Sequence, residues 1–166
     1  MNGGGKPNGL LVIGYGNTLR HDDGVGPKVA EAVEALHLPN IRTLICQQLS
    51  PEHADPISQS RVVVFVDAAV DAPKEVQCRK LEPDESSQLM AHAADPRTML
   101  ALARDVFGHA PEAWWLTIPA VKLGFGCELS PEAEAGYYTA LLHIHTLAEK
   151  FCPAEDKQCE VVANFG

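Results

Sequence analysis

Short apolar runs alternate along the chain with segments whose apolar residues recur every three or four positions. Residues 10–13 form a continuous apolar run that meets glycine, as a buried strand does where it enters a turn. From residue 25 to residue 36 the apolar side chains fall on one helical face. The pattern therefore predicts a strand, a loop and a helix, in that order.

The middle of the chain repeats this order. Residues 41–49 are predicted to form a second strand, and Ser50 followed by Pro51 is typical of the N-cap and first position of a short helix. Residues 62–66 form the most hydrophobic run of the chain, β-branched at nearly every position, which indicates a central parallel strand. Asp67 stands at the carboxyl end of this predicted strand.

The second half of the chain continues the alternation. Residues 75–81 are predicted to form a strand at a sheet edge, and residues 113–121 form another strand. Two helices begin with an N-cap residue followed by proline, at Asp95 and at Ser130, and the first of them ends at Gly108. Strands that alternate with helices predict an α/β fold with a mostly parallel sheet covered on both faces.

Length and charge limit the possible partners. The 166 residues suffice for one domain, so we expect a flexible leader over 1–9, a single α/β domain over 10–151 and a polar tail over 152–166. The net charge of -9 disfavours nucleic acid and membrane surfaces as partners. Neither a membrane span nor a signal peptide is evident, and five cysteines without a CxxC pair indicate reduced thiols. The cytoplasm is the expected location.

The segment GYGNTLRHDDGVG, residues 14–26, joins the first predicted strand to the first helix. A glycine loop at such a place is the setting of dinucleotide sites, but the GxGxxG spacing is not met, and Asp22 and Asp23 would repel a pyrophosphate. Capping of the helix N-terminus accounts for one of the two aspartates. The other is a candidate metal ligand or general base.

Two further residues could complete a site with this pair. Asp67 follows five apolar residues and needs a partner or water, although it could also cap a tight turn. His92 is assigned to a loop, where a histidine is more often exposed than a ligand. The loops after the first and third predicted strands meet at one rim of a parallel sheet. Two carboxylates and an imidazole would suit a divalent metal such as nickel or zinc.

The same segment, GYGNTLRHDDGVG, fits every fixed position of the signature GxGNxLxxDDGxG, and the sequence here resembles the nickel-iron hydrogenase maturation endopeptidases. The resemblance continues through QQLSPEHADPIS, VVVFVDAAVDAP, HAADPRTMLALARDVFG and GFGCELSPEA, and it covers about residues 9–150. It implies a three-layer α/β/α sandwich around a mostly parallel sheet of roughly five strands.

The resemblance also implies a protease that removes the C-terminal extension of a hydrogenase large-subunit precursor after nickel insertion. The metal-binding positions of the family fall on Asp23, Asp67 and His92. These residues are expected to contact nickel that the precursor supplies, and no organic cofactor is implied. Asp23 and Asp67 are the catalytic candidates, with Asp67 preferred as general base, and Asp22 is expected to cap the helix.

Two other functions stay open at this point. The first is a non-proteolytic nickel-sensing or chaperone protein that binds the hydrogenase precursor without cutting it. The second is a nucleotide-binding regulatory domain, which stabilisation by nucleotides in a thermal-shift experiment would favour. Cleavage of the precursor is the property that separates a protease from both.

Overall fold

The centre of the protein is a five-stranded sheet with the strand order β2-β1-β3-β5-β4. The computed structural model describes residues 7–71, 73–85 and 95–153. The strands are β1 (Leu10–Tyr15), β2 (Ile41–Cys46), β3 (Val62–Ala69), β4 (Gln77–Leu81) and β5 (Glu112–Pro119). The helices are α1 (Val25–Ala35), α2 (Ala54–Ser58), α3 (Pro96–Phe107) and α4 (Pro131–Phe151); the short 3-10 helices η1 (His21–Gly24) and η2 (Pro51–His53) precede α1 and α2.

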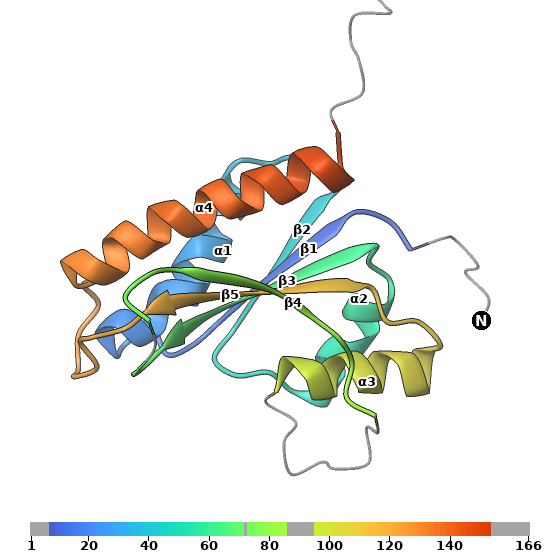
Figure 1. Ribbon diagram of the computed structural model, residues 1–166, viewed down its shortest axis with the longest axis horizontal. Coiled ribbons are helices and arrows are strands. Elements are labelled where there is room, and N and C mark those ends of the chain that lie inside the picture. The colour runs from blue at the N-terminus through green and yellow to red at the C-terminus, as the bar shows by residue number, and fades with distance from the viewer. Residues whose placement is uncertain (1–6, 72, 86–94, 154–166) are drawn as a thin grey trace, which may run out of the picture.

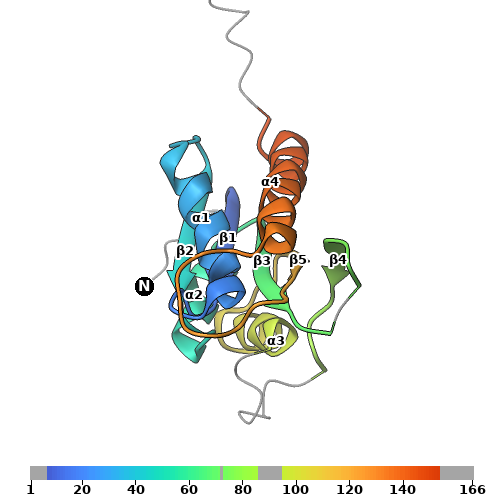
Figure 2. The ribbon, with the colours of Figure 1, turned by 90° about the vertical axis from the view of Figure 1, so that its left-hand side faces the viewer.

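Helices cover both faces of this sheet (Figures 1 and 2). α1 and α4 contact each other over one face, and α2 and α3 contact each other over the opposite face. Each face of the sheet therefore has its own apolar core. The expected three-layer α/β/α sandwich is confirmed.

The sheet is mostly parallel. β2, β1, β3 and β5 run parallel, whereas β4 pairs with β5 in the antiparallel sense at the edge. Residues 62–66 of β3 are completely buried, because helices cover both sides of this strand at the middle of the sheet. The predictions of a central strand at 62–66 and of an edge strand within 75–81 are confirmed.

Local signals placed the two long C-terminal helices correctly. Asp95 Oδ1 accepts a hydrogen bond from the Arg97 N–H at 2.8 Å, and Ser130 Oγ accepts one from the Ala133 N–H at 3.1 Å. Gly108 follows α3 with a φ of 82°, a left-handed conformation that glycine adopts without strain. Both predicted N-caps and the predicted terminator are confirmed.

Three predicted strand ends were wrong. β5 ends at Pro119 rather than at residue 121. β2 ends at Cys46 rather than at residue 49. The Cys46 carbonyl accepts a hydrogen bond from the Gly16 N–H at 3.2 Å. β3 continues to Ala69, because its last residues still pair with β5 as far as Pro119. Asp67 therefore lies inside β3, since backbone pairing with a neighbour does not end where the apolar pattern ends.

The ends of the chain fall largely outside the description. The predicted leader and tail include residues 1–6 and 154–166, which lie beyond the described ranges, so the extent of both segments stays a prediction. Within the described ranges, no helix combines the length and the apolar character needed to cross a bilayer.

Replacement of Phe65 by alanine tests the core beneath α2 and α3. Phe65 is completely buried in β3, packed in one cluster with Ile13 and Met99. Phe65→Ala should lower the free energy of unfolding by about 3 to 5 kcal/mol, because it removes buried apolar contacts and leaves a cavity. Urea unfolding measures this loss. Phe125→Ala is the matched control: Phe125 is exposed, so a change above about 0.5 kcal/mol there would contradict this assignment.

Candidate functional site

The candidate site lies at the carboxyl ends of the parallel strands, where the turn after β1 carries two aspartates. Gly16 begins this turn with a φ of 146°, and a Cβ there would lie 2.0 Å from the Asp23 carbonyl oxygen. A side chain at residue 16 is therefore excluded by both conformation and contact. The close approach folds the turn back on itself and brings η1 against the end of β1.

Asp23 is held by this turn. Its Oδ2 accepts the backbone N–H of Asn17 at 2.8 Å, and the Asn17 side chain in turn accepts the Leu19 N–H at 2.9 Å. Such a side chain to backbone bond two residues on is typical of asparagine in turns. The Asp23 carboxylate is only partly buried, which leaves it accessible for a ligand.

Asp67 lies in β3 beside Tyr15, the last residue of β1. The parallel register pairs Gly14 with Val66, so the next pair along the strands is Tyr15 and Asp67, both on the face that α2 and α3 cover. The Tyr15 hydroxyl donates a hydrogen bond to the Asp67 carboxylate. Sequence reasoning missed Tyr15. The signal that could have found it is the alternation of β1, which puts residues 11, 13 and 15 on one face.

The pKa of Asp67 is raised to about 6. Burial is the largest cause, because it disfavours the charged form, and the negative charge of Asp23 adds to it. Hydrogen bonds from Tyr15 and from the Ala68 backbone act in the opposite direction. The influence of Asp23 shows that the two candidate carboxylates lie close enough for their charges to interact. Asp67 therefore changes its protonation state close to neutral pH.

Tyr15 stays protonated under all ordinary conditions. Burial raises the pKa of its hydroxyl most, and the Asp67 carboxylate raises that pKa further, by its charge and by the hydrogen bond. The Trp115 indole opposes this rise, although its buried N–H has no hydrogen-bond partner among the described residues. Tyr15 is therefore a fixed donor to Asp67.

Asp22 was expected to cap α1, but it does not. The α1 N-cap is Gly24, which has no side chain that could cap the helix. Asp22 is fully buried, and its carboxylate accepts the N–H groups of Val121, Lys122 and Ser130 and the Ser130 hydroxyl, at 2.7 to 2.9 Å. The sequence-based assignment failed because these donors are 99 to 108 residues away along the chain.

The four hydrogen bonds decide the charge of Asp22. Burial raises its pKa, but the bonds from Ser130, Val121 and Lys122 outweigh burial, so that the net pKa lies below its usual value. The carboxylate is therefore ionised at neutral pH. It joins the turn after β1 to the loop between β5 and α4.

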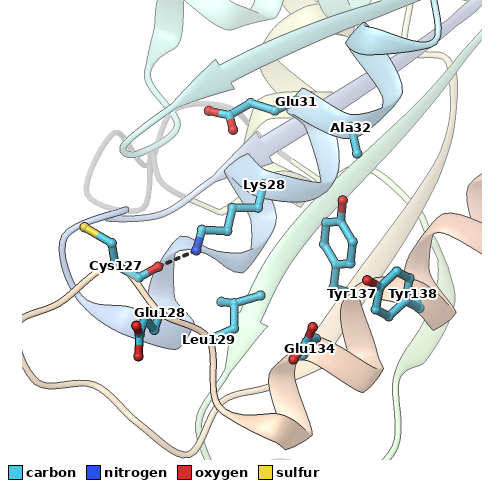
Figure 3. Close-up of a pocket in the computed structure, with 9 residues that line it drawn as sticks. All are labelled: Lys28, Glu31, Ala32, Cys127, Glu128, Leu129, Glu134, Tyr137 and Tyr138. Atoms are coloured by element: carbon cyan, nitrogen blue, oxygen red, sulfur yellow. Dashed lines mark hydrogen bonds between the residues drawn. The ribbon is translucent and has the colours of Figure 1, made fainter.

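His21 adds to this junction. Its backbone N–H donates to the Gly126 carbonyl at 2.7 Å, and its ring Nδ1 lies 2.8 Å from the Glu128 carbonyl oxygen. Lys28, from the first turns of α1, donates to the carbonyl of Cys127 (Figure 3). The loop after β5 is thus built onto the segment that carries Asp23.

The third predicted ligand, His92, lies outside the described residues. Within the part of the chain that the structure describes, no group of three histidine, cysteine, aspartate or glutamate side chains is arranged to hold a metal ion. The described part of the site therefore offers two carboxylates, Asp23 and Asp67. Carboxylate oxygens are suitable ligands for a divalent cation and suitable acceptors for a proton from water.

A cavity of about 790 Å³ lies between α1, α4 and the loop after β5 (Figure 3). Lys28 of α1, Cys127 of the loop after β5, and Tyr137 and Tyr138 of α4 contribute to its walls, together with three glutamates: Glu31, Glu128 and Glu134. Neither Asp23 nor Asp67 lines this cavity. We therefore assign the candidate chemistry to the rim of the sheet and not to this cavity.

Comparison with known proteins identifies the fold. The maturating endopeptidase HybD of E. coli matches with a TM-score of 0.67 and 22% identity over 86% of this chain and 93% of that one. The [NiFe] hydrogenase maturation protease HybD of Thermococcus kodakarensis matches with a TM-score of 0.64 and 24% identity over 84% and 99%. A hydrogenase 2 maturation peptidase from Thaumarchaeota archaeon SCGC_AB-539-E09 matches with 0.63 and 23% over 87% and 99%.

These similarities show that the chain has the fold of the hydrogenase maturation endopeptidases. The resemblance inferred from the motifs is confirmed at this level. No protein-family model matches the sequence, and no curated protein matches it.

Replacement of Asp22 by asparagine tests the junction. In Asp22→Asn an NH2 group replaces one of the two accepting oxygens and meets N–H donors of the backbone. The substitution should therefore lower the free energy of unfolding at pH 7 by about 3 kcal/mol. Because the folded pKa lies below the unfolded value of 3.8, the stabilisation is complete above that value and is lost as the pH falls through the folded pKa.

Urea unfolding at pH 7 and pH 3 measures this difference. The gap between wild type and Asp22→Asn should shrink at the lower pH. Asp71→Asn is the control, because Asp71 is exposed and has a φ of 56°, which asparagine tolerates. An equal, small effect of both substitutions would contradict the role of Asp22.

Replacement of Asp67 by asparagine should stabilise the fold above pH 6. The folded pKa of about 6 exceeds the ordinary value of 3.8, so the native state binds more protons between these values and stability falls as the pH rises through them. Asparagine has no charge to bury. We expect a gain of about 1 to 2 kcal/mol at pH 8, less than the whole shift implies because the carboxyl is partly solvated, and little gain at pH 4. Urea unfolding at both pH values checks this; a loss of stability at pH 8 would contradict it.

Proposed function

We propose that this protein is an endopeptidase that removes the C-terminal extension of a nickel-iron hydrogenase large-subunit precursor after nickel insertion. One observation carries the proposal. A partly buried carboxyl with a pKa of about 6, Asp67, feels the charge of a second carboxylate, Asp23, at the carboxyl ends of the strands in a chain that has the fold of the hydrogenase maturation endopeptidases. The motif of residues 14–26 supports the same reaction.

Asp67 is proposed as the general base. Its carboxylate accepts a proton from a water molecule, and the water oxygen attacks the carbonyl carbon of the scissile peptide bond. The carbon–nitrogen bond of the tetrahedral intermediate then breaks, and the proton on Asp67 passes to the leaving amine. A base with a pKa near the working pH suits both transfers, because it can accept and return the proton. Tyr15 fixes one side of the carboxylate during these steps.

Recognition of the metal is proposed to use Asp23, Asp67 and His92. In this proposal the three side chains contact nickel that the precursor already holds, so that the finished precursor alone is cut. The metal is part of the substrate. Two partly buried carboxylates whose charges interact are suitable donors for a divalent cation, which supports the assignment of Asp23 and Asp67.

We place the reaction in the cytoplasm. The four cysteines among the described residues form no disulfide, which agrees with a reducing compartment: Cys46, Cys78, Cys127 and Cys152. An acidic chain with a net charge of -9 also agrees with a protein partner rather than nucleic acid or a membrane surface.

The intact mass of the precursor tests the proposal. A purified large-subunit precursor, nickel-loaded or nickel-free, is incubated with wild type, with Asp67→Asn or with Asp71→Asn. We expect loss of the C-terminal extension with wild type and Asp71→Asn, on the nickel-loaded precursor only. Asp67→Asn should cleave at least about a hundredfold more slowly, because it lacks the base.

Binding of the same precursor is measured in parallel. A wild-type protein that binds the precursor and never changes its mass would replace the protease by the chaperone function. Cleavage of the nickel-free precursor at an equal rate would contradict recognition of the metal, while leaving the protease in place.

A further inference from the structure

Exposed apolar side chains gather around the candidate carboxylates. Every parallel strand carries at least one of them at its carboxyl end or in the loop that follows. We call these five residues the apolar rim: Leu19, Ile45, Val70, Val121 and Phe125. Phe125 is 94% exposed and Leu19 is 61% exposed. Large apolar side chains that are grouped and exposed mark surfaces for association.

One shared cavity and backbone hydrogen bonds bring members of the apolar rim from different strand ends close together. Leu19 and Ile45 line one cavity of about 350 Å³ beside the turn that holds Asp23. The Leu19 carbonyl accepts the N–H of Gly126 at 2.9 Å, which places the turn after β1 next to Phe125. These contacts connect the ends of β2, β1 and β5 around Asp23.

The other side of the apolar rim lies at the end of β3, the strand that carries Asp67. The Ala120 N–H donates to the Ala69 carbonyl at 3.0 Å, and the residues that follow these two are Val121 and Val70. Asp67 lies two residues before Ala69 in β3. The apolar rim therefore borders both candidate catalytic carboxylates.

The backbone beneath these side chains is fixed. Asp22 binds the N–H of Val121 at 2.9 Å, and His21 binds the carbonyl of Gly126 next to Phe125. The Asn17 side chain binds the N–H of Leu19. Side chains presented on a preorganised backbone lose little freedom on binding, which favours association with a partner.

We infer that the apolar rim is the docking surface for the polypeptide whose peptide bond is cut, the hydrogenase precursor. This inference rests on the proposed function. An aromatic side chain as exposed as Phe125 cannot enclose a small ligand; it can enter a hollow on a protein partner, as interface anchors do. The cavity between Leu19 and Ile45 is at the small end of ligand sites, of about 300 to 1,000 Å³, and fits an apolar side chain near the scissile bond.

Kinetics on the nickel-loaded precursor test the inference. Cleavage is followed by intact mass at increasing precursor concentration for wild type, Phe125→Asp, Leu19→Asp and Leu142→Asp. Leu142 is the matched control, since this leucine is 68% exposed but lies on α4, away from the rim. We expect KM to rise about tenfold for Phe125→Asp and Leu19→Asp, with kcat within about twofold, and no change for Leu142→Asp.

Binding separates this inference from the proposed function. The dissociation constant for the nickel-loaded precursor is measured for the single variant Asp67→Asn and for the double variant Asp67→Asn with Phe125→Asp. The added Phe125→Asp substitution should weaken binding about tenfold. If wild type binds the precursor but never cleaves it, and the rim variants bind it more weakly, the docking surface is supported and the protease is refuted. Cleavage with unchanged KM in both rim variants would overturn the docking surface and leave the protease in place.

Two further outcomes would also overturn it. If wild type neither binds nor cleaves the precursor, the apolar rim has another occupant. If Phe125→Asp turns a dimer into a monomer in light scattering while KM is unchanged, the rim is a contact between two copies of this chain. Thermal unfolding of each variant checks the fold; because both rim side chains are exposed, their replacement should leave the unfolding temperature nearly unchanged.

Discussion

The buried carboxylate of Asp22 is the interaction on which the rim of the sheet depends. It collects four hydrogen bonds from Val121, Lys122 and Ser130, and one of these residues is the N-cap of α4. An ionised carboxylate is tolerated in the interior only when its oxygens are satisfied, so the two loops it joins have one favourable arrangement. Asp22 therefore fixes the surroundings of Asp23 without touching a substrate.

Asp67 shows the opposite balance between stability and function. Its partial burial in β3, the middle strand of the sheet, favours the neutral acid, whereas a general base, the role proposed for Asp67, must be ionised when it acts. The Tyr15 hydroxyl and the Ala68 N–H reduce this conflict, and the charge of Asp23 increases it. A carboxyl whose pKa is close to neutral pH makes the fold less stable than an uncharged side chain would. It is, however, able to accept and release a proton. Side chains with strongly shifted pKa values are found mostly at functional sites.

The two kinds of surface at this rim support each other. In the proposed function, the carboxylates Asp23 and Asp67 supply the chemistry, and the apolar rim supplies contact area that a small substrate would not need. Asp23, Leu19 and Phe125 lie on two segments that hydrogen bonds join, the turn after β1 and the loop after β5. In the proposed function, docking and catalysis therefore share one frame of hydrogen-bonded loops, so that a bound polypeptide would lie where the carboxylates can act on it.

The sequence by itself determined the order of strands and helices, the caps at Asp95 and Ser130, and the candidate carboxylates, because periodicity and capping are local properties. The tertiary structure decided what is nonlocal. It gave Asp22 partners 99 to 108 residues away instead of a helix to cap, extended β3 beyond its apolar run, and put Tyr15 next to Asp67. Pairing between strands and burial of charge depend on neighbours distant in the chain, and no local pattern contains them.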